Sequence, residues 1–264
     1  IWATCQQSST FCRYVNIDDC WQVAREPVTG VIVPDPARFP SGLKAIADWL
    51  HQHGMLFGIY TAAHGTTCQS RPGSYLYERI DSRSYCEFGI DYLKIDQCGG
   101  DSYEHHGEDK NMSWLAFQRG FKECLQSTGR AIVQSVESCG TVSGCGEWIA
   151  NCANLWRTGS DLEATWGSVM KNLDQTAPLF SLAGVRDTGM GVAGHWNDPD
   201  MLQVWPATLP RRLRLSPSVC APSLCLTLSH SLCAPGRKRG TDSDREPLAL
   251  RPLVLPSSSL TDRH

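Results

Sequence analysis

Residues 91–96, Asp-Tyr-Leu-Lys-Ile-Asp, alternate polar and apolar side chains over a strand-like length. Successive side chains of a strand point to opposite faces, so Leu93 and Ile95 share one face and Lys94 shares the other with Asp96. The positive charge of Lys94 favours the ionised form of the neighbouring carboxyl group. The stretch therefore predicts a β-strand that ends in a charged carboxylate. Taken alone, this pattern fits a structural ion pair equally well.

Similar strand-like runs recur outward from this stretch, and amphipathic segments lie between them. The strand-like runs cover residues 14–18, 55–60, 131–136 and 154–157, with a short one before Asn197. Helices are predicted within 41–54, 112–125 and 166–182, and Pro178 should interrupt the last of these. Strands that alternate with helices are typical of βαβ units and a parallel sheet. Six such units indicate an α/β fold, an incomplete (β/α)8 TIM barrel.

The bulk composition fits one soluble domain and narrows its partners. At 264 residues the chain is long enough for a barrel of about 250 residues. A net charge of −3, without basic clusters, argues against nucleic acid, and no apolar run is long enough to span a membrane. Thirteen cysteines indicate an oxidising compartment.

Composition and hydrophobic periodicity divide the chain into three parts. Residues 14–208 carry the strand and helix pattern and form the predicted partial barrel, whereas residues 1–13 remain unassigned. Residues 209–264 are rich in Ser, Pro, Leu and Arg and have no sustained period. Such composition predicts a low-complexity, disordered tail.

Acidic residues lie at or just beyond the carboxyl ends of the predicted strands, where a parallel barrel places its active site. Metal binding and sugar binding are the two uses of such a cluster. Histidine, a common ligand of metal-dependent barrels, is nearly absent from these positions, so we expect no metal and no cofactor. Carboxylates near Arg, Lys, Tyr and Trp suit a neutral polyol. With several strand ends acidic, Asp96 is better read as functional than as structural. The acidic positions are Asp18, Asp19, Asp96, Glu137, Asp161, Asp198 and Asp200.

Six short motifs recur in one order in a known enzyme family. They are Y-V-N-I-D-D-C-W (14–21), D-P-x-R-F-P-x-G (35–42), G-x-Y (58–60), D-Y-L-K-I-D-Q-C (91–98), W-R-x-x-x-D (156–161) and W-N-D-P-D-M-L (196–202). In these motifs the chain resembles glycoside hydrolase family 27, which contains α-galactosidases and α-N-acetylgalactosaminidases. The resemblance covers about residues 14–205.

The resemblance implies a role for each matching residue. Asp96 would be the nucleophile of a double displacement, and Asp161 the acid that becomes the base in the second step. Retaining enzymes hold these carboxyl groups about 5–5.5 Å apart. Asp18 and Asp19 match the pair that bonds the 4-OH and 6-OH of galactose. Further sugar contacts are implied for Tyr60, Lys94, Arg157 and Asp200, and a disulfide beside the nucleophile for Cys68 and Cys98.

Glu137 bears on which sugar the site would accept. At the matching position the galactosidases carry an acidic residue near the 2-OH, and the N-acetyl-specific relatives carry a small one. We therefore expect cleavage of terminal α-D-galactosyl residues from an oligosaccharide, glycolipid or glycoprotein. The alternatives are α-N-acetylgalactosaminidase, β-L-arabinopyranosidase, or an inactive galactose-binding remnant. The resemblance also leaves room for a homodimer, and for a secreted, lysosomal or vacuolar location.

The chain departs from the family pattern at both ends of the match. Family members begin with a strand that carries a Gly-Trp motif, and they continue past W-N-D-P-D-M-L with an eighth strand and a β-sandwich domain. We expect a barrel without these strands to leave two strand edges unpaired. On that basis the chain as written is expected to be unstable or inactive.

Overall fold

A computed structural model describes residues 2–5, 12–109, 111–137, 149–187, 193–200 and 225–227. Residue contacts divide the chain into a unit of residues 1–234 and a second of 235–264, and every described residue belongs to the first. The predicted tail lies outside the described residues except for 225–227.

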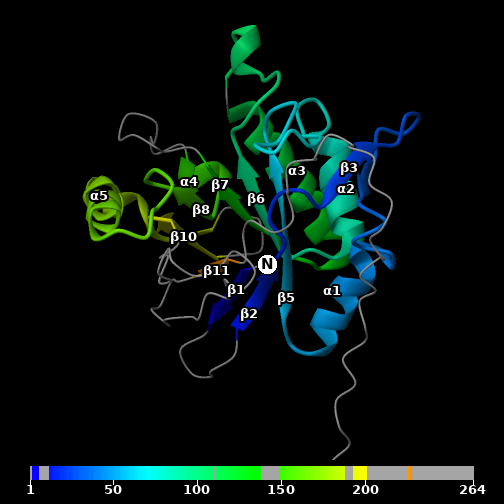
Figure 1. Ribbon diagram of the computed structural model, residues 1–264, viewed down its shortest axis with the longest axis horizontal. Coiled ribbons are helices and arrows are strands. Elements are labelled where there is room, and N and C mark those ends of the chain that lie inside the picture. The colour runs from blue at the N-terminus through cyan, green and yellow to red at the C-terminus, as the bar shows by residue number, and fades with distance from the viewer. Residues whose placement is uncertain are drawn as a thin grey trace, which may run out of the picture. The chain divides into compact units, whose positions relative to one another are not determined.

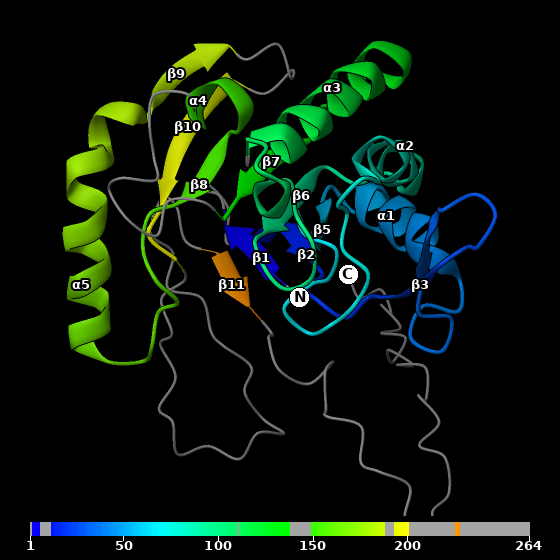
Figure 2. The ribbon, with the colours of Figure 1, turned by 90° about the horizontal axis from the view of Figure 1, so that it is seen from above.

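The core of the first unit is a sheet of six parallel strands that curls into half a barrel (Figures 1 and 2). Each strand pairs in parallel with the next in this series. The six predicted βα strands are thereby confirmed, with ends shifted by two residues or fewer at all five runs whose bounds were predicted. The strands are β2 (Cys12–Asn16), β5 (Leu56–Ala62), β6 (Tyr92–Asp96), β7 (Val133–Val136), β8 (Leu155–Arg157) and β10 (Ala193–Asp198).

Helices cover the outside of this sheet. The three predicted helices are confirmed as α1 (Gly42–Gln52), α3 (Asn111–Thr128) and α5 (Trp166–Thr176). Pro178 falls where α5 gives way to the 3-10 helix η2 (Ala177–Leu182). The sequence analysis missed α2 (Glu78–Phe88), which packs between α1 and α3 (Figure 2). Two short helices complete the described set, η1 (Glu104–His106) and α4 (Ile149–Cys152).

Strand β6 alternates as its sequence predicts. Leu93 and Ile95 are fully buried in the hydrophobic core beneath the helices, together with Trp114, Phe117 and Phe121 of α3. The side chains of Lys94 and Asp96 are 19% and 14% exposed on the opposite face. On β6 this alternation gives an apolar face toward the helices and a polar opposite face, whose last residue, Asp96, lies at the carboxyl end where a barrel places its active site.

The outer parallel strands β2 and β10 have antiparallel neighbours, so the two open edges of the described sheet fall on the strands beyond them. Strand β1 (Trp2–Cys5) lies antiparallel to β2, and β9 (Gly184–Asp187) lies antiparallel to β10. Strand β11 (Cys225–Thr227) pairs with β1, while β3 (Gln22–Arg25) and β4 (Ile32–Pro34) form a separate hairpin. Such pairing satisfies backbone groups that a strand edge would otherwise expose.

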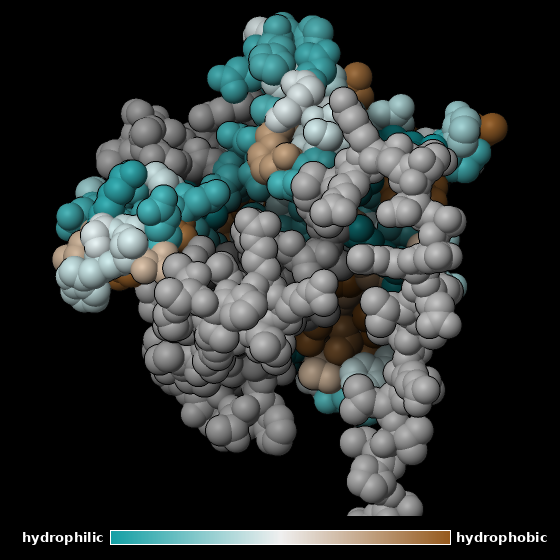
Figure 3. All heavy atoms as spheres, in the orientation of Figure 1, coloured by the Kyte–Doolittle hydropathy of each residue, from teal (hydrophilic) through white to brown (hydrophobic). Residues whose placement is uncertain are grey.

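The exposed surface of α5 is mostly hydrophilic, with apolar residues along one margin (Figure 3). Among the described helices, none has the length and the apolar character to cross a membrane.

Candidate active site

The end of β6 holds Asp96 through both carboxylate oxygens. The hydroxyl of Tyr60 donates a hydrogen bond of 2.7 Å to Oδ2, and the backbone N–H of Gln97 donates one of 2.7 Å to Oδ1. The Nζ atom of Lys94 lies 4.0 Å from Oδ2. Two hydrogen bonds and a cation fix the direction of this carboxylate and stabilise negative charge on it.

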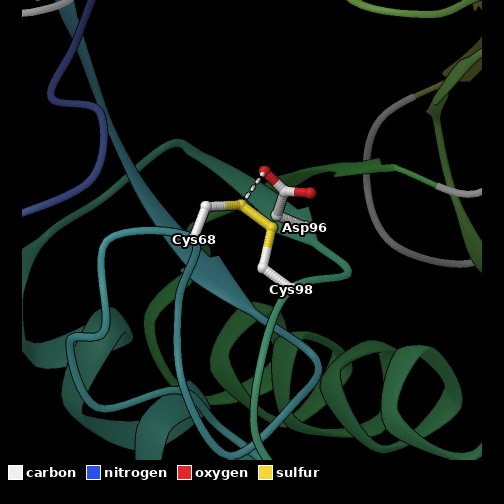
Figure 4. A group of neighbouring side chains, drawn as sticks. All are labelled: Cys68, Asp96 and Cys98. Atoms are coloured by element: carbon white, nitrogen blue, oxygen red, sulfur yellow. Dashed lines mark hydrogen bonds between the residues drawn. A yellow bond between two sulfur atoms is a disulfide. The ribbon is translucent and has the colours of Figure 1, made fainter.

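A disulfide lies directly against Asp96 (Figure 4). Cys68 and Cys98, the pair that the family resemblance implies, are bonded to each other, and Sγ of Cys68 is 3.5 Å from Oδ2 of Asp96. Cys68 follows β5 and Cys98 follows β6, so the bond ties together two loops of the same sheet edge. These three residues are close enough to hold a metal ion, but the two sulfur atoms are bonded to each other.

Arg157, at the end of β8, joins three carboxylates. Its guanidinium lies 3.1 Å from Oε2 of Glu137, 3.1 Å from Oδ1 of Asp161 and 3.2 Å from Oδ2 of Asp200. The Arg157 side chain is only 5% exposed, whereas that of Asp161 is 97% exposed. A planar guanidinium with five N–H donors suits this arrangement. The carboxylates come from three separate segments of the chain, which the cation draws to one place.

The two clusters share one electrostatic environment. Burial on its own would lower the pKa of Lys94, but the negative charges of Asp18, Asp96 and Glu137 outweigh it and raise the pKa. Residues from three strand ends therefore lie within range of one ammonium group. The backbone N–H of Glu137 also donates to the carbonyl of Ile95, one residue before Asp96.

Burial raises the pKa of Glu137 to about 7, although the positive charges of Arg157 and Lys94 act in the opposite direction. At neutral pH this carboxyl group is therefore divided between its charged and neutral forms. A neutral Glu137 can donate a hydrogen bond as well as accept one.

Asp18 and Asp19 lie in the loop after β2 rather than at its end, because β2 stops at Asn16. Oδ2 of Asp19 accepts a 3.0 Å hydrogen bond from the backbone N–H of Gln69, next to the disulfide cysteine Cys68. Burial raises the pKa of Asp19. The pair thus belongs to the same loop cluster as the disulfide.

Strand β10 ends at an acidic residue, Asp198, that the sequence analysis did not select as a sugar contact. Asp198 is named there as a strand-end acid, but only Asp200 is predicted to contact sugar. Oδ1 of Asp198 accepts a 2.9 Å hydrogen bond from the backbone N–H of Asp200, and burial raises the pKa of Asp198. Two aspartates separated by a proline are the only sequence signal for such a turn.

Comparison with known proteins agrees with this fold. The sequence model of the family described as Alpha galactosidase A matches residues 7–212. A solved structure of α-galactosidase from Saccharomyces cerevisiae with raffinose has a TM-score of 0.59 and 27% identity; the match covers 75% of this chain and 46% of that one. A barrel with carboxylates gathered at its strand ends is the architecture of a glycoside hydrolase. The chain belongs to the α-galactosidase family of these enzymes.

Curated relatives with two activities resemble the chain equally. The α-galactosidase of Cyamopsis tetragonoloba is 36% identical over 193 residues, covering 73% of this chain and 43% of that protein. The α-N-acetylgalactosaminidase of Gallus gallus is 36% identical over 197 residues, covering 72% and 45%. The chain spans less than half the length of these curated relatives.

Proposed function

We propose that the site belongs to a retaining exo-α-galactosidase, with Asp96 as nucleophile and Asp161 as acid and base. In the first step, a carboxylate oxygen of Asp96 bonds to the anomeric carbon while Asp161 gives its proton to the departing glycosidic oxygen. In the second step, Asp161 takes a proton from water, the water oxygen bonds to the anomeric carbon, and the bond to Asp96 breaks.

The contacts of Asp96 are the observation that carries this proposal. A nucleophilic carboxylate has to remain charged and to point in one direction, and Tyr60 and Lys94 supply both conditions. The exposure of Asp161 suits a group that must reach first a leaving oxygen and then a water molecule.

Sugar hydroxyls would bind to the remaining polar side chains at this edge. Asp18 and Asp19 are assigned to the 4-OH and 6-OH of galactose, as in the family. Tyr60, Lys94, Arg157 and Asp200 supply further contacts. Carboxylates that accept from hydroxyls, and cations that donate to sugar oxygens, suit a neutral polyol.

Glu137 is assigned to the 2-OH and favours galactose over its N-acetylated counterpart. Arg157 holds its carboxyl group in place on one side. A 2-acetamido group would have to displace this carboxyl group and would leave Arg157 without that partner. An α-N-acetylgalactosaminidase stays the second candidate because the Gallus gallus relative is as similar as the α-galactosidase of Cyamopsis tetragonoloba.

A covalent label tests the proposal even where turnover is slow. The chain is incubated with an α-galactose-configured cyclophellitol aziridine, which alkylates a nucleophilic carboxylate. We expect one label on the peptide that contains Asp96 and none in Asp96→Asn. A label elsewhere, or equal labelling of the variant, overturns the nucleophile assignment.

A substrate panel separates the candidate sugars. Nitrophenyl α-galactoside, α-N-acetylgalactosaminide and β-L-arabinopyranoside are compared at equal concentration. We expect the galactoside to react fastest. Turnover of the N-acetylated substrate alone would establish the second candidate.

We infer an oxidising compartment, either secreted or lysosomal or vacuolar. The disulfides Cys68–Cys98 and Cys86–Cys124 support it, since such bonds persist where thiols are not kept reduced. The location of the tagged protein in its own cells tests this inference, and a cytosolic signal would contradict it.

A further inference from the structure

Asn172 occupies an unusual place for an asparagine. It lies inside helix α5 and is only 1% exposed. Asparagine is among the poorer helix formers, and a buried amide has to find hydrogen-bond partners. Within the described residues, its Oδ1 atom is buried and has no hydrogen-bond partner. Asn172 is therefore unfavourable for the helix itself, and any stabilisation that it provides has to come from hydrogen bonds of its Nδ2 group.

The Nδ2 group of Asn172 uses both of its N–H donors on backbone carbonyls. One hydrogen bond of 2.9 Å goes to the carbonyl of Ser160, and one of 2.8 Å goes to the carbonyl of Pro199. Because both partners are acceptors, only this orientation of the amide satisfies them. The two carbonyls belong to the residues directly before Asp161 and Asp200. One side chain thus links the two loops that carry these carboxylates.

The peptide group on the other side of Asp161 is held as well. The backbone N–H of Leu162 donates a 2.7 Å hydrogen bond to Oδ2 of Asp200, which also contacts Arg157. Asp200 has a φ of 74°, a left-handed conformation that a residue other than glycine adopts at a cost. Its position is therefore imposed by its surroundings, and the turn in which it lies is the one that Asn172 holds.

The contact between α5 and the Asp161 loop leaves no room for adjustment. A Cβ atom built on Gly159 would lie 2.7 Å from Cγ of Asn172, closer than real Cβ contacts. The backbone of Gly159 therefore packs directly on the amide. The Asp161 side chain, in contrast, is almost wholly exposed, and Arg157 is its hydrogen-bond partner in the described region. The location of this carboxylate depends on its backbone more than on side-chain packing.

We propose that Asn172 is a positioning residue for Asp161. It holds the peptide before Asp161 directly, through the Ser160 carbonyl. It holds the peptide after Asp161 indirectly, through the turn that contains Asp200. The inference rests on the proposed role of Asp161 as acid and base. Loss of both donors would remove these two hydrogen bonds from the carbonyls of Ser160 and Pro199 and free the loop. Such a loop holds the acid poorly, while the nucleophile end at β6 stays intact.

Hydrogen exchange of the whole chain tests the positioning without any need for turnover. Asn172→Leu keeps about the same side-chain volume and removes both N–H donors. If this variant fails to fold, Asn172→Asp takes its place, because it has the shape of asparagine and lacks both donors at neutral pH. We expect exchange of residues 158–164 to rise about tenfold or more, with β5 and β6 unchanged. The control is Lys171→Met on the same helix, whose Nζ donates a 3.3 Å hydrogen bond to the Ser160 hydroxyl and none to the Ser160 or Pro199 carbonyl among the described contacts. Unchanged exchange of 158–164, or an equal rise in β5 and β6, overturns the proposal.

Kinetics with two leaving groups tests the consequence for catalysis. Melibiose needs a proton on its departing oxygen, whereas a dinitrophenyl α-galactoside does not. We expect Asn172→Leu to lower kcat/KM for melibiose about tenfold more than for the activated substrate. Equal losses would indicate a purely structural role. If the unaltered chain hydrolyses neither substrate, the proposed function fails, and the exchange experiment still decides the role of Asn172.

Discussion

The raised pKa of Glu137 predicts how the stability of the fold depends on pH. Burial of this carboxyl group, whose side chain is 24% exposed, raises its pKa from the ordinary value of 4.5 to about 7 in the folded chain. The unfolded chain keeps the ordinary value. Between these two pKa values the folded chain binds the proton and the unfolded chain does not, so stability falls as pH rises.

The size of the effect follows from the difference between the two states. A difference of about 2.5 in pKa corresponds to about 3 kcal/mol of unfolding free energy. Below pH 4.5 both states hold the proton, and the full stability is present. The loss accumulates as pH rises and is complete above about 7. In Glu137→Gln the side chain keeps its shape and an oxygen for Arg157 but cannot ionise, so this loss disappears.

Urea unfolding at a series of pH values measures the difference in unfolding free energy between Glu137→Gln and the unaltered chain. We expect Glu137→Gln to become more stable relative to the unaltered chain by about 3 kcal/mol between pH 4.5 and 7.5. Glu123→Gln, an exposed acid on α3, is the control and should show a nearly constant difference. If the difference in unfolding free energy between Glu137→Gln and the unaltered chain stays constant with pH, or changes in the other direction, then Arg157 and Lys94 outweigh burial in setting the pKa of Glu137.

Three further substitutions probe the fold and the site. Arg25→Met should lower the unfolding free energy by about 3–5 kcal/mol in a urea titration, because it leaves the wholly buried Asp81 without its cation; a loss below 1 kcal/mol would contradict this. Tyr60→Phe should lower kcat/KM for an aryl α-galactoside by about tenfold to a hundredfold, since Asp96 loses a hydrogen bond to a charged group, and unchanged turnover would remove Tyr60 from the site. Glu137→Ser should raise the ratio of N-acetylgalactosaminide to galactoside hydrolysis, and an unchanged ratio would mean that another residue selects the 2-substituent.

The sequence predicts the strand ends well because two simple rules coincide there. In β6 the alternation of side chains separates the core residues Leu93 and Ile95 from Lys94 and Asp96. The topology of parallel strands then brings distant acids to one edge. Strand boundaries are less certain, since β2 ends two residues before Asp18. Neither rule depends on details of side-chain packing, which is why short runs of sequence suffice.

Helix α2 shows where this kind of prediction fails. Its buried face consists largely of polar residues, including Glu78, Asp81 and Ser82, so no apolar stripe marks it as a packed helix. Asp81 is buried because Arg25, far away in sequence, pairs with it. Ser82 is buried because α3 approaches at Gly120, where an added Cβ would lie 2.0 Å from the serine hydroxyl. Both causes are tertiary and leave no periodic signal in the sequence.

The same limit applies to the residues that hold the candidate site in place. Asp96 and Asp161 stand in recognisable motifs, but an asparagine within a helix, such as Asn172, looks like an ordinary surface residue. Only the three-dimensional structure shows that it faces two carbonyls from different loops. Residues that touch a substrate can be read from sequence motifs, whereas residues that orient them depend on how the loops meet.

Carboxyl groups outnumber cations at this edge of the sheet, and burial makes some of these carboxyl groups harder to ionise. Burial raises the pKa of Asp19, Glu137 and Asp198, so that these groups hold their protons to higher pH than an exposed acid would. Each proton that is kept lowers the repulsion felt by Asp96. A protonated carboxyl group can also donate to a sugar oxygen, which a carboxylate cannot do. Under the proposed function, the same crowding would supply a polyol with donors as well as acceptors, and the proposed nucleophile Asp96 is the carboxylate that lies beside Lys94.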